Sequence, residues 1–208
     1  MKSQHKSVSF GERTFIIYKE VYEPAEDTFL IAENLSVACG EKILDMGTGC
    51  GILAVIAAEK ASKVVAVDVN PHAVNCAKKN ADLNGARAKV EVRQGNLFSS
   101  VRDTERFDLI LFNAPYLPVE RDEGRSWIER AWSGGETGRI VIDQFINVAP
   151  SYLTEKGRIL LVQSTLSDVD KTMAEFSGKG LDAEIIAEKK SLFESIILVK
   201  AALRKTRE

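Results

Sequence analysis

The sequence predicts a doubly wound α/β fold with a mostly parallel seven-stranded sheet that ends in an antiparallel hairpin. Three observations support this prediction. Short apolar runs of strand length alternate with helix-forming runs, as in sheets built with right-handed crossovers. A glycine-rich turn at 47–51 follows the first strand of that series. The last two strand-like runs leave no room for a helix between them, so they should pair antiparallel.

The core elements begin with "EKILDMG" (41–47), a short apolar run typical of a buried strand. The run "GILAVIAAEKA" (51–61) favours a helix behind the glycine turn, and "KVVAVDV" (63–69) is the second strand. A helix should begin next, because Asn70 can cap it and Pro71 suits the first helical position.

That helix is expected to end at Asn84 and Gly85, which form a stop signal. The run "AKVEVRQG" (88–95) alternates polar and apolar residues, which predicts a half-exposed strand at a sheet edge. The run "RFDLILF" (106–112) is apolar throughout after Asp108, as in a central parallel strand that is covered on both faces.

The rest of the chain completes this pattern as a single domain. Ahead of the core 36–208, the segment 1–35 should form a small hairpin (8–22) and a helix (23–35) over the front of the sheet. The expected elements after the fourth strand are a helix at about 137–154, a strand at 157–164, a helix at 168–180, and a hairpin of 181–190 and 195–203.

Composition indicates an ordinary globular protein, with 45% hydrophobic and 28% charged residues in 208 and a net charge of −2. A balance of this kind gives no overall positive field for nucleic acid. Cys39, Cys50 and Cys76 lack the spacing of metal ligands, so no metal site is expected and they are interpreted as reduced thiols. Because the start lacks an apolar signal core and no long apolar span follows, we expect a cytoplasmic protein without membrane contact.

The glycine turn is the first candidate ligand site, because ligands of this fold bind beyond the carboxyl ends of the strands. Gly47, Gly49 and Gly51 give GxGxG, whereas a dinucleotide fingerprint would require a third glycine at Ile52. The carboxylate of Asp45, just before the turn, would repel a pyrophosphate. It would attract a ligand with an ammonium and a sulfonium group, which points to S-adenosyl-L-methionine as the cofactor.

The next two strands end in further candidate residues for this cofactor. Asp68 closes the second strand, where a carboxylate can accept hydrogen bonds from ribose hydroxyls. Its alternative role, helix capping, is already available to Asn70. After the third strand, Asn96 could meet the adenine amino group and Leu97 could pack on the ring. Asn96 could equally be a turn residue.

The fourth strand ends in Asn113, Ala114, Pro115 and Tyr116, which would suit a holder for a planar nitrogen. The side-chain carbonyl of Asn113 and the main-chain carbonyl of Ala114 can each accept a hydrogen bond from an NH₂ group. Tyr116 offers a flat face for stacking. Two acceptors would take up positive charge as a methyl group arrives, so no strong base is required. The alternative is an ordinary strand-end turn.

With these motifs, the sequence resembles the HemK/PrmC-type protein glutamine methyltransferases, in particular their archaeal and eukaryotic branch. The motifs that carry the resemblance are "VYEPAEDTFL" (21–30), "ILDMGTGCG" (43–51), "NAPYLP" (113–118) and "AWSGGETGRIVIDQF" (131–145). The resemblance implies a Rossmann-like class I S-adenosylmethionine-dependent methyltransferase fold. The residues that it places at or beside the cofactor are Thr28, Asp45, Gly47, Asp68, Asn96, Leu97 and Asn113.

Two positions depart from the family pattern. Ala114 replaces the first proline of the usual NPPY motif, which loosens the loop but keeps its carbonyl group. Asn96 stands where an aspartate is usual.

The resemblance further implies the substrate, which is the glutamine of the Gly-Gly-Gln loop in a class 1 translation termination factor. Asn113 to Tyr116 would hold its amide. A small zinc-binding activator protein is an implied partner, and the edge strand 88–95 could pair with it. The alternative is that Lys89, Glu91 and Arg93 simply protect this edge from pairing. The charged stretch 117–139, with Trp127 and Trp132, is interpreted as a substrate lid, although the tryptophans could serve only to pack it.

Other functions stay open at this stage. A nucleobase amine presents the same planar nitrogen, so an RNA or DNA amino-methyltransferase is the main rival. A lysine methyltransferase is a further alternative. A cofactor-binding scaffold without catalysis is the alternative from another class. Glu26 and Asp27 could form a charged wall for the substrate, but we interpret them as ordinary first-turn carboxylates of a helix start.

Overall fold

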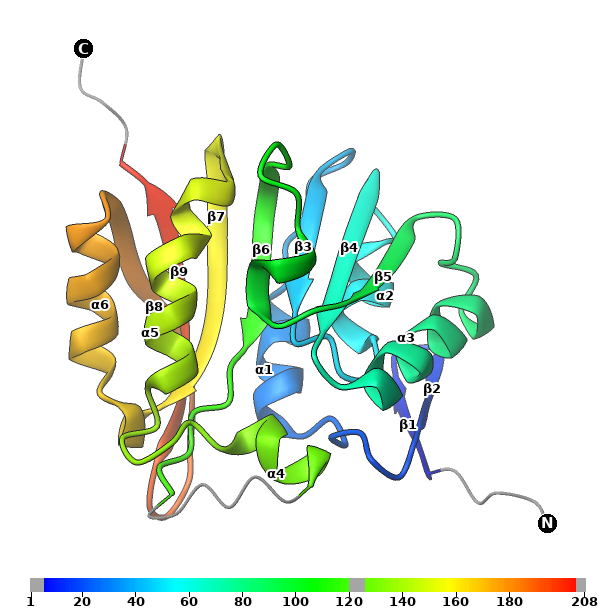
Figure 1. Ribbon diagram of the computed structural model, residues 1–208, viewed down its shortest axis with the longest axis horizontal. Helices are drawn as coiled ribbons and strands as arrows, with labels where there is room; N and C mark the ends of the chain where they lie inside the picture. Colours follow the sequence, from blue (N-terminus) through cyan, green and yellow to red (C-terminus); the bar gives the residue numbers. More distant parts are fainter. Residues whose placement is uncertain (1–5, 120–125, 205–208) are drawn as a thin grey trace.

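The computed structural model describes residues 6–119 and 126–204. A seven-stranded sheet in the order β5-β4-β3-β6-β7-β9-β8 forms its centre, and a separate pair joins β1 to β2 (Figure 1). The strands are β1 Lys6–Phe10, β2 Arg13–Ile17, β3 Lys42–Met46, β4 Lys63–Asp68, β5 Val90–Gln94, β6 Phe107–Asn113, β7 Leu153–Ser164, β8 Leu181–Lys190 and β9 Ser195–Leu203.

The strand directions confirm the predicted fold class. All neighbours from β5 through β7 pair in parallel, whereas β9 pairs antiparallel with both β7 and β8. The order reverses at β3, which has β4 on one side and β6 on the other. The crevice beyond the carboxyl end of β3 is therefore the place where such a fold binds a ligand.

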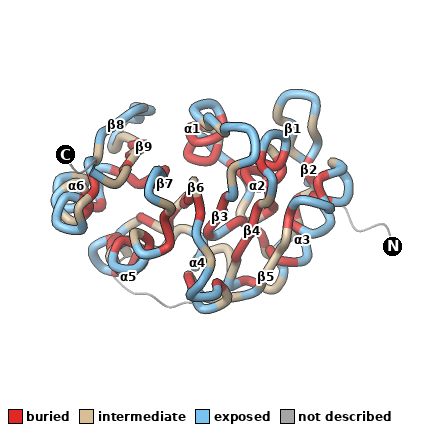
Figure 2. The backbone as a smooth tube through the Cα atoms, turned by 90° about the horizontal axis from the view of Figure 1, so that it is seen from above, coloured by how far each residue is buried: buried red, intermediate tan, exposed pale blue. Residues whose placement is uncertain are grey.

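Helices cover both faces of the sheet (Figure 2). On one face α2 contacts α1 and α3, and on the other α5 contacts α6. The α-helices are α1 Glu26–Asn34, α2 Ile52–Ala57, α3 Pro71–Leu83, α4 Trp127–Trp132, α5 Ile140–Val148 and α6 Val169–Gly178.

The uniformly apolar strands are buried on both sides, as their sequences predict. Leu109, Ile110 and Leu111 of β6 are fully buried, as are Ile43 and Leu44 of β3. Such strands bury side chains of both pleat directions between the two helical layers. These buried strands form a rigid base for the crevice at their carboxyl ends.

The predicted start of α3 is confirmed, because the Asn70 side chain accepts from the backbone N–H of His72 at 2.9 Å. The predicted helix 137–154 was too long. It begins at Ile140 and ends at Val148, and a 3₁₀ turn follows up to Tyr152. Pro150 explains the early end, because proline cannot donate the hydrogen bond that would continue an α-helix. Strand β7 consequently starts at Leu153, before the predicted position 157.

The predicted sheet edge at 88–95 is confirmed, since β5 is the outermost strand on its side. Charged side chains cover it. Arg93 pairs with Glu91 at 2.7 Å and with Glu105 at 2.7 Å, and Glu91 also pairs with Lys63. Hydrogen bonds from Arg93 and Lys63 lower the pKa of Glu91 to about 2. The edge thus carries an ion-pair network that discourages unselective pairing with other strands.

Candidate active site

A cavity of about 590 Å³ lies beyond the carboxyl ends of β3, β4 and β6. This volume is within the range of cavities that hold a cofactor-sized ligand. Its lining includes most residues that the sequence analysis selected for the cofactor, namely Thr28, Gly47, Gly49, Asp68, Asn96, Leu97 and Asn113.

The glycine turn forms the floor of the cavity at the end of β3. Gly47 and Gly49 have φ angles of 64° and 57°, which side chains with a Cβ rarely adopt. A Cβ on Gly49 would meet no atom within 4 Å, so this glycine borders open space. Gly51 does not line the cavity. A Cβ there would stand 3.0 Å from Ala77, so Gly51 allows α2 to pack closely on α3.

Asp45 lies beneath the floor rather than in the cavity lining and is 1% exposed. Its Oδ2 accepts from the Thr48 hydroxyl at 2.6 Å. Burial raises the pKa of Asp45 to about 7. The hydrogen bond from Thr48 lowers this pKa, whereas the negative charge of Asp68 raises it further. A positive charge in the cavity would therefore favour the ionised carboxylate.

Asp68 lines the cavity and holds the glycine turn in place. Its Oδ2 accepts from the backbone N–H of Gly49 at 2.8 Å, and its Oδ1 accepts from that of Asn70 at 2.9 Å. Burial raises the pKa of Asp68, while these backbone donors act in the opposite direction. Each carboxylate oxygen keeps a lone pair that could accept from a ligand hydroxyl.

Asn96 and Leu97 form the wall that follows β5. The backbone N–H of Asn96 donates to the Ser99 hydroxyl at 2.8 Å, and Asn96 caps the 3₁₀ turn Leu97–Ser100. Asn96 is therefore a turn residue and also lines the cavity. Leu97 has a φ of 47°. A left-handed conformation is unfavourable for leucine, and strain of this kind concentrates at ligand sites.

The tetrapeptide 113–116, which begins at the last residue of β6, separates this cavity from a second one of about 240 Å³. Asn113 and Pro115 line the first cavity, whereas Ala114 and Tyr116 line the second. Alternate residues of one segment thus face the two spaces. Tyr22 and Ala131 also line both, so the two cavities adjoin each other.

Asn113 presents an unpaired acceptor at this boundary. Its Nδ2 donates to the Thr28 hydroxyl oxygen at 3.2 Å. Its Oδ1 is buried and has no hydrogen-bond partner among the residues that the structure describes. A buried carbonyl oxygen without a partner is costly, and it indicates a site that a ligand donor completes.

Asp27 is the residue that the sequence reasoning interpreted wrongly, because it preferred a helix-start role over a place in the site. It is not an ordinary first-turn carboxylate, because it is 6% exposed and lies inside the site. Its Oδ2 accepts from the hydroxyls of Tyr22 and Tyr116 at 3.1 Å and 3.3 Å. Its Oδ1 accepts from the N–H of Thr28 at 2.6 Å and from its hydroxyl at 3.2 Å. Asp27 therefore connects both aromatic rings to the residue that holds Asn113.

Tyr116 remains a neutral phenol in this setting. Burial is the main reason that its pKa is raised, and the charge of Asp27 adds to the rise. The same causes raise the pKa of Tyr22. The two hydroxyls donate to Asp27, so both rings are fixed as flat walls rather than as bases.

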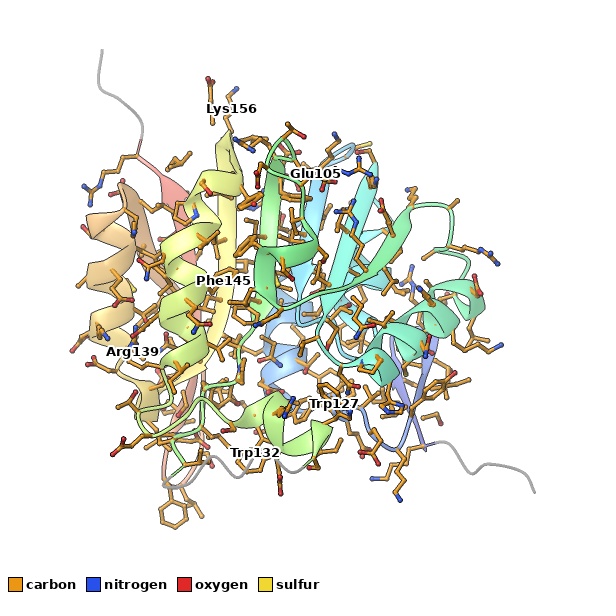
Figure 3. The ribbon with its side chains drawn as sticks, in the orientation of Figure 1. Glu105, Trp127, Trp132, Arg139, Phe145 and Lys156 are labelled. Atoms are coloured by element: carbon orange, nitrogen blue, oxygen red, sulfur yellow. The ribbon has the colours of Figure 1, made fainter. Side chains whose placement is uncertain are left out.

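The stretch interpreted as a lid is partly visible, because 120–125 fall outside the described residues. Figure 3 shows Trp127 and Trp132 on α4 at the carboxyl ends of the strands. Trp127 and Arg130 both line the first cavity, and the guanidinium of Arg130 lies 5.0 Å from the centroid of the Trp127 ring. Trp132 lines the second cavity. Both tryptophans therefore border the site.

The glycines after α4 support the tetrapeptide from outside. The N–H of Gly134 donates to the carbonyl of Leu117 at 2.9 Å. Gly138 has a φ of 73°, and a Cβ on it would collide with the carbonyl oxygen of Tyr116. The W-x-GG-x-x-G pattern thus lets a turn lie directly on the backbone that follows Asn113.

The other polar candidates are not suited to act as catalytic groups. Cys50 lines the first cavity, but burial raises the pKa of its thiol to about 12, so it is not a nucleophile. His72 is exposed on α3, and His5 lies outside the described residues. Within 6–119 and 126–204, no group of three or more His, Cys, Asp or Glu residues could hold a metal ion. In the same ranges, no helix has the length and apolar character to cross a membrane.

Sequence comparison gives a consistent family assignment. A family model described as "Methyltransferase small domain" matches residues 24–130. The chain is 39% identical over 187 residues to MJ0928 of Methanocaldococcus jannaschii, which carries the name of a protein N5-glutamine methyltransferase; the match covers 89% of this chain and 93% of that protein. It is 30% identical over 192 residues to methyltransferase HEMK2 of Homo sapiens, covering 88% and 90%.

Solved structures support the fold. A chain of the E. cuniculi Mtq2–Trm112 complex, which is described as methylating the eRF1 translation termination factor, has a TM-score of 0.70 at 23% identity. The alignment covers 89% of this chain and 99% of that one. The tRNA m1G37 methyltransferase of M. jannaschii has a TM-score of 0.72 at 20% identity, covering 99% and 59%.

Proposed function

We propose a defined reaction for this chain, which belongs to the HemK-type family of protein N5-glutamine methyltransferases. The enzyme transfers a methyl group from S-adenosyl-L-methionine to the side-chain amide nitrogen of a glutamine. The acceptor is the glutamine of the Gly-Gly-Gln loop in a class 1 translation termination factor. A substrate of this kind would place the enzyme in the cytoplasm.

The single observation that carries this proposal is the unpaired Oδ1 of Asn113. It is buried at the boundary of the two cavities, while Nδ2 is held by Thr28. A primary amide that enters from the second cavity would offer the missing donor. Ala114 lines that cavity, and its main-chain carbonyl would be a second acceptor for the same NH₂ group.

The chain's residues would promote transfer by position and charge. An amide nitrogen is a weak nucleophile because its lone pair is delocalised into the carbonyl group. Two fixed acceptors favour its pyramidal form and stabilise the positive charge that develops on nitrogen. The rings of Tyr22 and Tyr116, held by Asp27, keep the amide in the second cavity and lower the entropic barrier. The transfer would leave S-adenosylhomocysteine, and the positively charged methylated nitrogen would lose one proton to water, so no histidine is needed as a base.

S-adenosyl-L-methionine fits the residues of the first cavity. The only acidic residue in the described lining is Asp68, and the only basic one is Arg130, so a pyrophosphate would find little positive charge. We assign Asp68 to the ribose hydroxyls, Asn96 and Leu97 to the adenine, and Gly47, Gly49 and Thr28 to close contact with the cofactor. When bound, this cofactor supplies the methyl group. Asp45 and Gly51 do not line the cavity and would act indirectly, Asp45 through its charge beneath the glycine turn and Gly51 through the close packing of α2 on α3.

The choice of substrate also rests on the relatives. MJ0928 is named for glutamine methylation, and the E. cuniculi complex is described as acting on eRF1. The same complex contains a second protein, Trm112. We propose that this chain likewise works with a small zinc-binding activator and that the β5 edge is the surface available to it.

A transfer assay with methyl-labelled cofactor tests the proposal. The acceptors are an intact termination factor, the same factor with its loop glutamine changed to alanine, and bulk RNA. Reactions are run with and without the activator. Label in the intact factor alone is the expected result. Label in RNA, equal label in both forms of the factor, or no label in any arm would contradict the proposed function.

A further inference from the structure

We propose that the β8–β9 turn is a docking element for the protein substrate. Leu192 and Phe193, at the tip of this turn, would bind an apolar depression of the termination factor outside its Gly-Gly-Gln loop. This inference rests on the proposed function and adds a recognition surface to it.

The turn has an unusual apolar tip. Leu192 is 92% exposed and Phe193 is 90% exposed, whereas no other large apolar side chain in the described part of the chain exceeds 53%. The turn closes through the N–H of Ser191, which donates to the carbonyl of Glu194 at 2.8 Å. A short turn favours glycine, asparagine or serine at its tip, so neither local conformation nor core packing explains two large apolar residues there.

The tip lies at the same edge of the sheet as the candidate active site. Ile196 pairs with Ser164 at the carboxyl end of β7, and the N–H of Ser195 donates to the Thr165 hydroxyl at 3.0 Å. In the neighbouring pair, Asn113 is opposite Val162 of the same strand. Figure 1 accordingly shows the β8–β9 connection at the end of the sheet where α4 lies.

The base of the turn carries a charge that acts on the tetrapeptide. The charge of Glu194 contributes to the raised pKa of Tyr116, after burial, Asp27 and Tyr22. The Oε2 atom of Glu194 is buried and has no hydrogen-bond partner within the described residues. A donor from a bound protein segment would satisfy this oxygen. A docked substrate that donates to this oxygen would therefore contact the base of the turn as well as its apolar tip.

The turn is also held in place. Lys189 of β8 pairs with Glu26 of α1 at 3.6 Å, and the pairing of β8 with β9 continues to Lys190 and Ser195. The apolar tip is thus presented on a fixed hairpin, which reduces the entropic cost of binding.

The chemistry of the acceptor loop explains why a macromolecule should use this surface. Two glycines beside the reacting glutamine offer no side chains, so the loop alone gives the enzyme little to recognise. Neither Leu192 nor Phe193 lines either cavity, so a small ligand held there would not contact them. Apolar side chains beside the cavities would instead meet the body of the substrate protein.

Steady-state kinetics with two substrates test the inference. The variant carries Leu192→Ser and Phe193→Ser, and the acceptors are the intact termination factor and a short synthetic peptide with the Gly-Gly-Gln sequence. For the intact factor we expect the double change to raise KM about tenfold, which corresponds to about 1.4 kcal/mol, and to leave kcat within about twofold. Methylation of the peptide should be unchanged.

Leu83→Ser is the matched control, because Leu83 is an apolar residue with 52% exposure at the carboxyl end of α3. It should leave both substrates unaffected. An unchanged KM for the intact factor in the double variant, while the parent enzyme is active, overturns the docking inference alone. An equal loss of activity with the peptide also overturns it. The inference fails as well if analytical ultracentrifugation shows that the parent enzyme is a dimer and that the double variant is a monomer. No transfer by the parent enzyme to either substrate refutes the proposed function, and the inference with it.

Discussion

The side-chain amide of Asn113 donates to the hydroxyl oxygen of Thr28 across 3.2 Å, and this contact fixes which end of the amide faces the cavity. The Thr28 hydroxyl donates its hydrogen bond to the carboxylate of Asp27, so towards Asn113 its oxygen can only accept. The relay from Asp27 through Thr28 thus leaves Oδ1 of Asn113 as the free acceptor.

Replacement of Asn113 by alanine should abolish methyl transfer and spare the cofactor. The change removes the acceptor for the substrate amide, while the glycine turn and Asp68 remain. We expect cofactor affinity within about tenfold of the parent, or about 1.4 kcal/mol, in isothermal titration calorimetry. Loss of all cofactor binding would contradict the role given to Asn113.

Thr28→Val should lower kcat while Thr28→Ser should retain most of it. Valine has the shape of threonine but cannot accept from Asn113 or donate to Asp27, so the amide loses its fixed orientation. One buried hydrogen bond of this kind is worth about 1–2 kcal/mol, which corresponds to a loss of about tenfold in kcat. If serine and valine were equally impaired, the methyl group rather than the hydroxyl would be the important feature.

Gly138→Ala should damage catalysis through the backbone of Tyr116. A Cβ at this position collides with the Tyr116 carbonyl oxygen, so the tetrapeptide must shift. We expect a loss in kcat of at least about tenfold, because small displacements of positioning groups are costly.

Gly180→Ala is the control for backbone strain. Gly180 has a φ of 82°, close to the 73° of Gly138, but a Cβ there would meet no atom within 4 Å. This variant should lose only about 1 kcal/mol of stability and keep its kcat. Equal loss of activity in both variants would refute the collision with Tyr116 as the cause.

Asp45 should make the stability of the ligand-free protein depend on pH. Burial raises the pKa of this carboxyl from 3.8 to about 7 in the folded protein. Between these values the folded protein binds the proton more tightly than the unfolded chain does. The free energy of unfolding therefore falls as pH rises through this window, by about 4 kcal/mol at most.

Asp45→Asn should flatten this dependence, because the variant has no proton to lose at this position. Urea unfolding of both proteins at about pH 4, 6 and 8 measures the difference. Asp68, whose pKa burial also raises, should leave a residual slope of the same sign in the variant. An identical slope in both proteins would show that Asp45 does not titrate in this window.

Arg139 should contribute strongly to stability. It is 4% exposed, donates to the Ser167 carbonyl at 2.6 Å and the Thr172 hydroxyl at 2.9 Å, and pairs with Asp143 and Glu175. Arg139→Met should cost about 3–5 kcal/mol in urea unfolding, because it leaves these acceptors unpaired. Arg204→Met, which breaks an exposed pair with Asp182, should cost at most about 1 kcal/mol.

Much of the fold follows from local pattern. The uniformly apolar run 106–112 is a central strand, and the alternating run 88–95 is the edge strand. The spacing of apolar residues along a strand shows whether one face or both faces are buried. The boundary at Pro150 was also visible in sequence, but the apolar residues around it extended the predicted helix. The final hairpin followed from the absence of a crossover between its strands.

The site was less accessible to this reasoning. Asp27 looks like a first-turn carboxylate, and its partner Tyr116 is 89 residues away in the chain. No local pattern reports such a contact. The apolar tip at Leu192 and Phe193 was likewise hidden, because a sequence alone does not say which apolar residues stay exposed.

The most direct test of the central claim is an experimental structure with S-adenosylhomocysteine and a glutamine peptide bound. The account predicts that the peptide's amide nitrogen lies about 3 Å from Oδ1 of Asn113, within hydrogen-bond distance, and that the cofactor sulfur faces that nitrogen. A structure in which Oδ1 binds the cofactor instead, or in which the amide lies outside the second cavity, would contradict it.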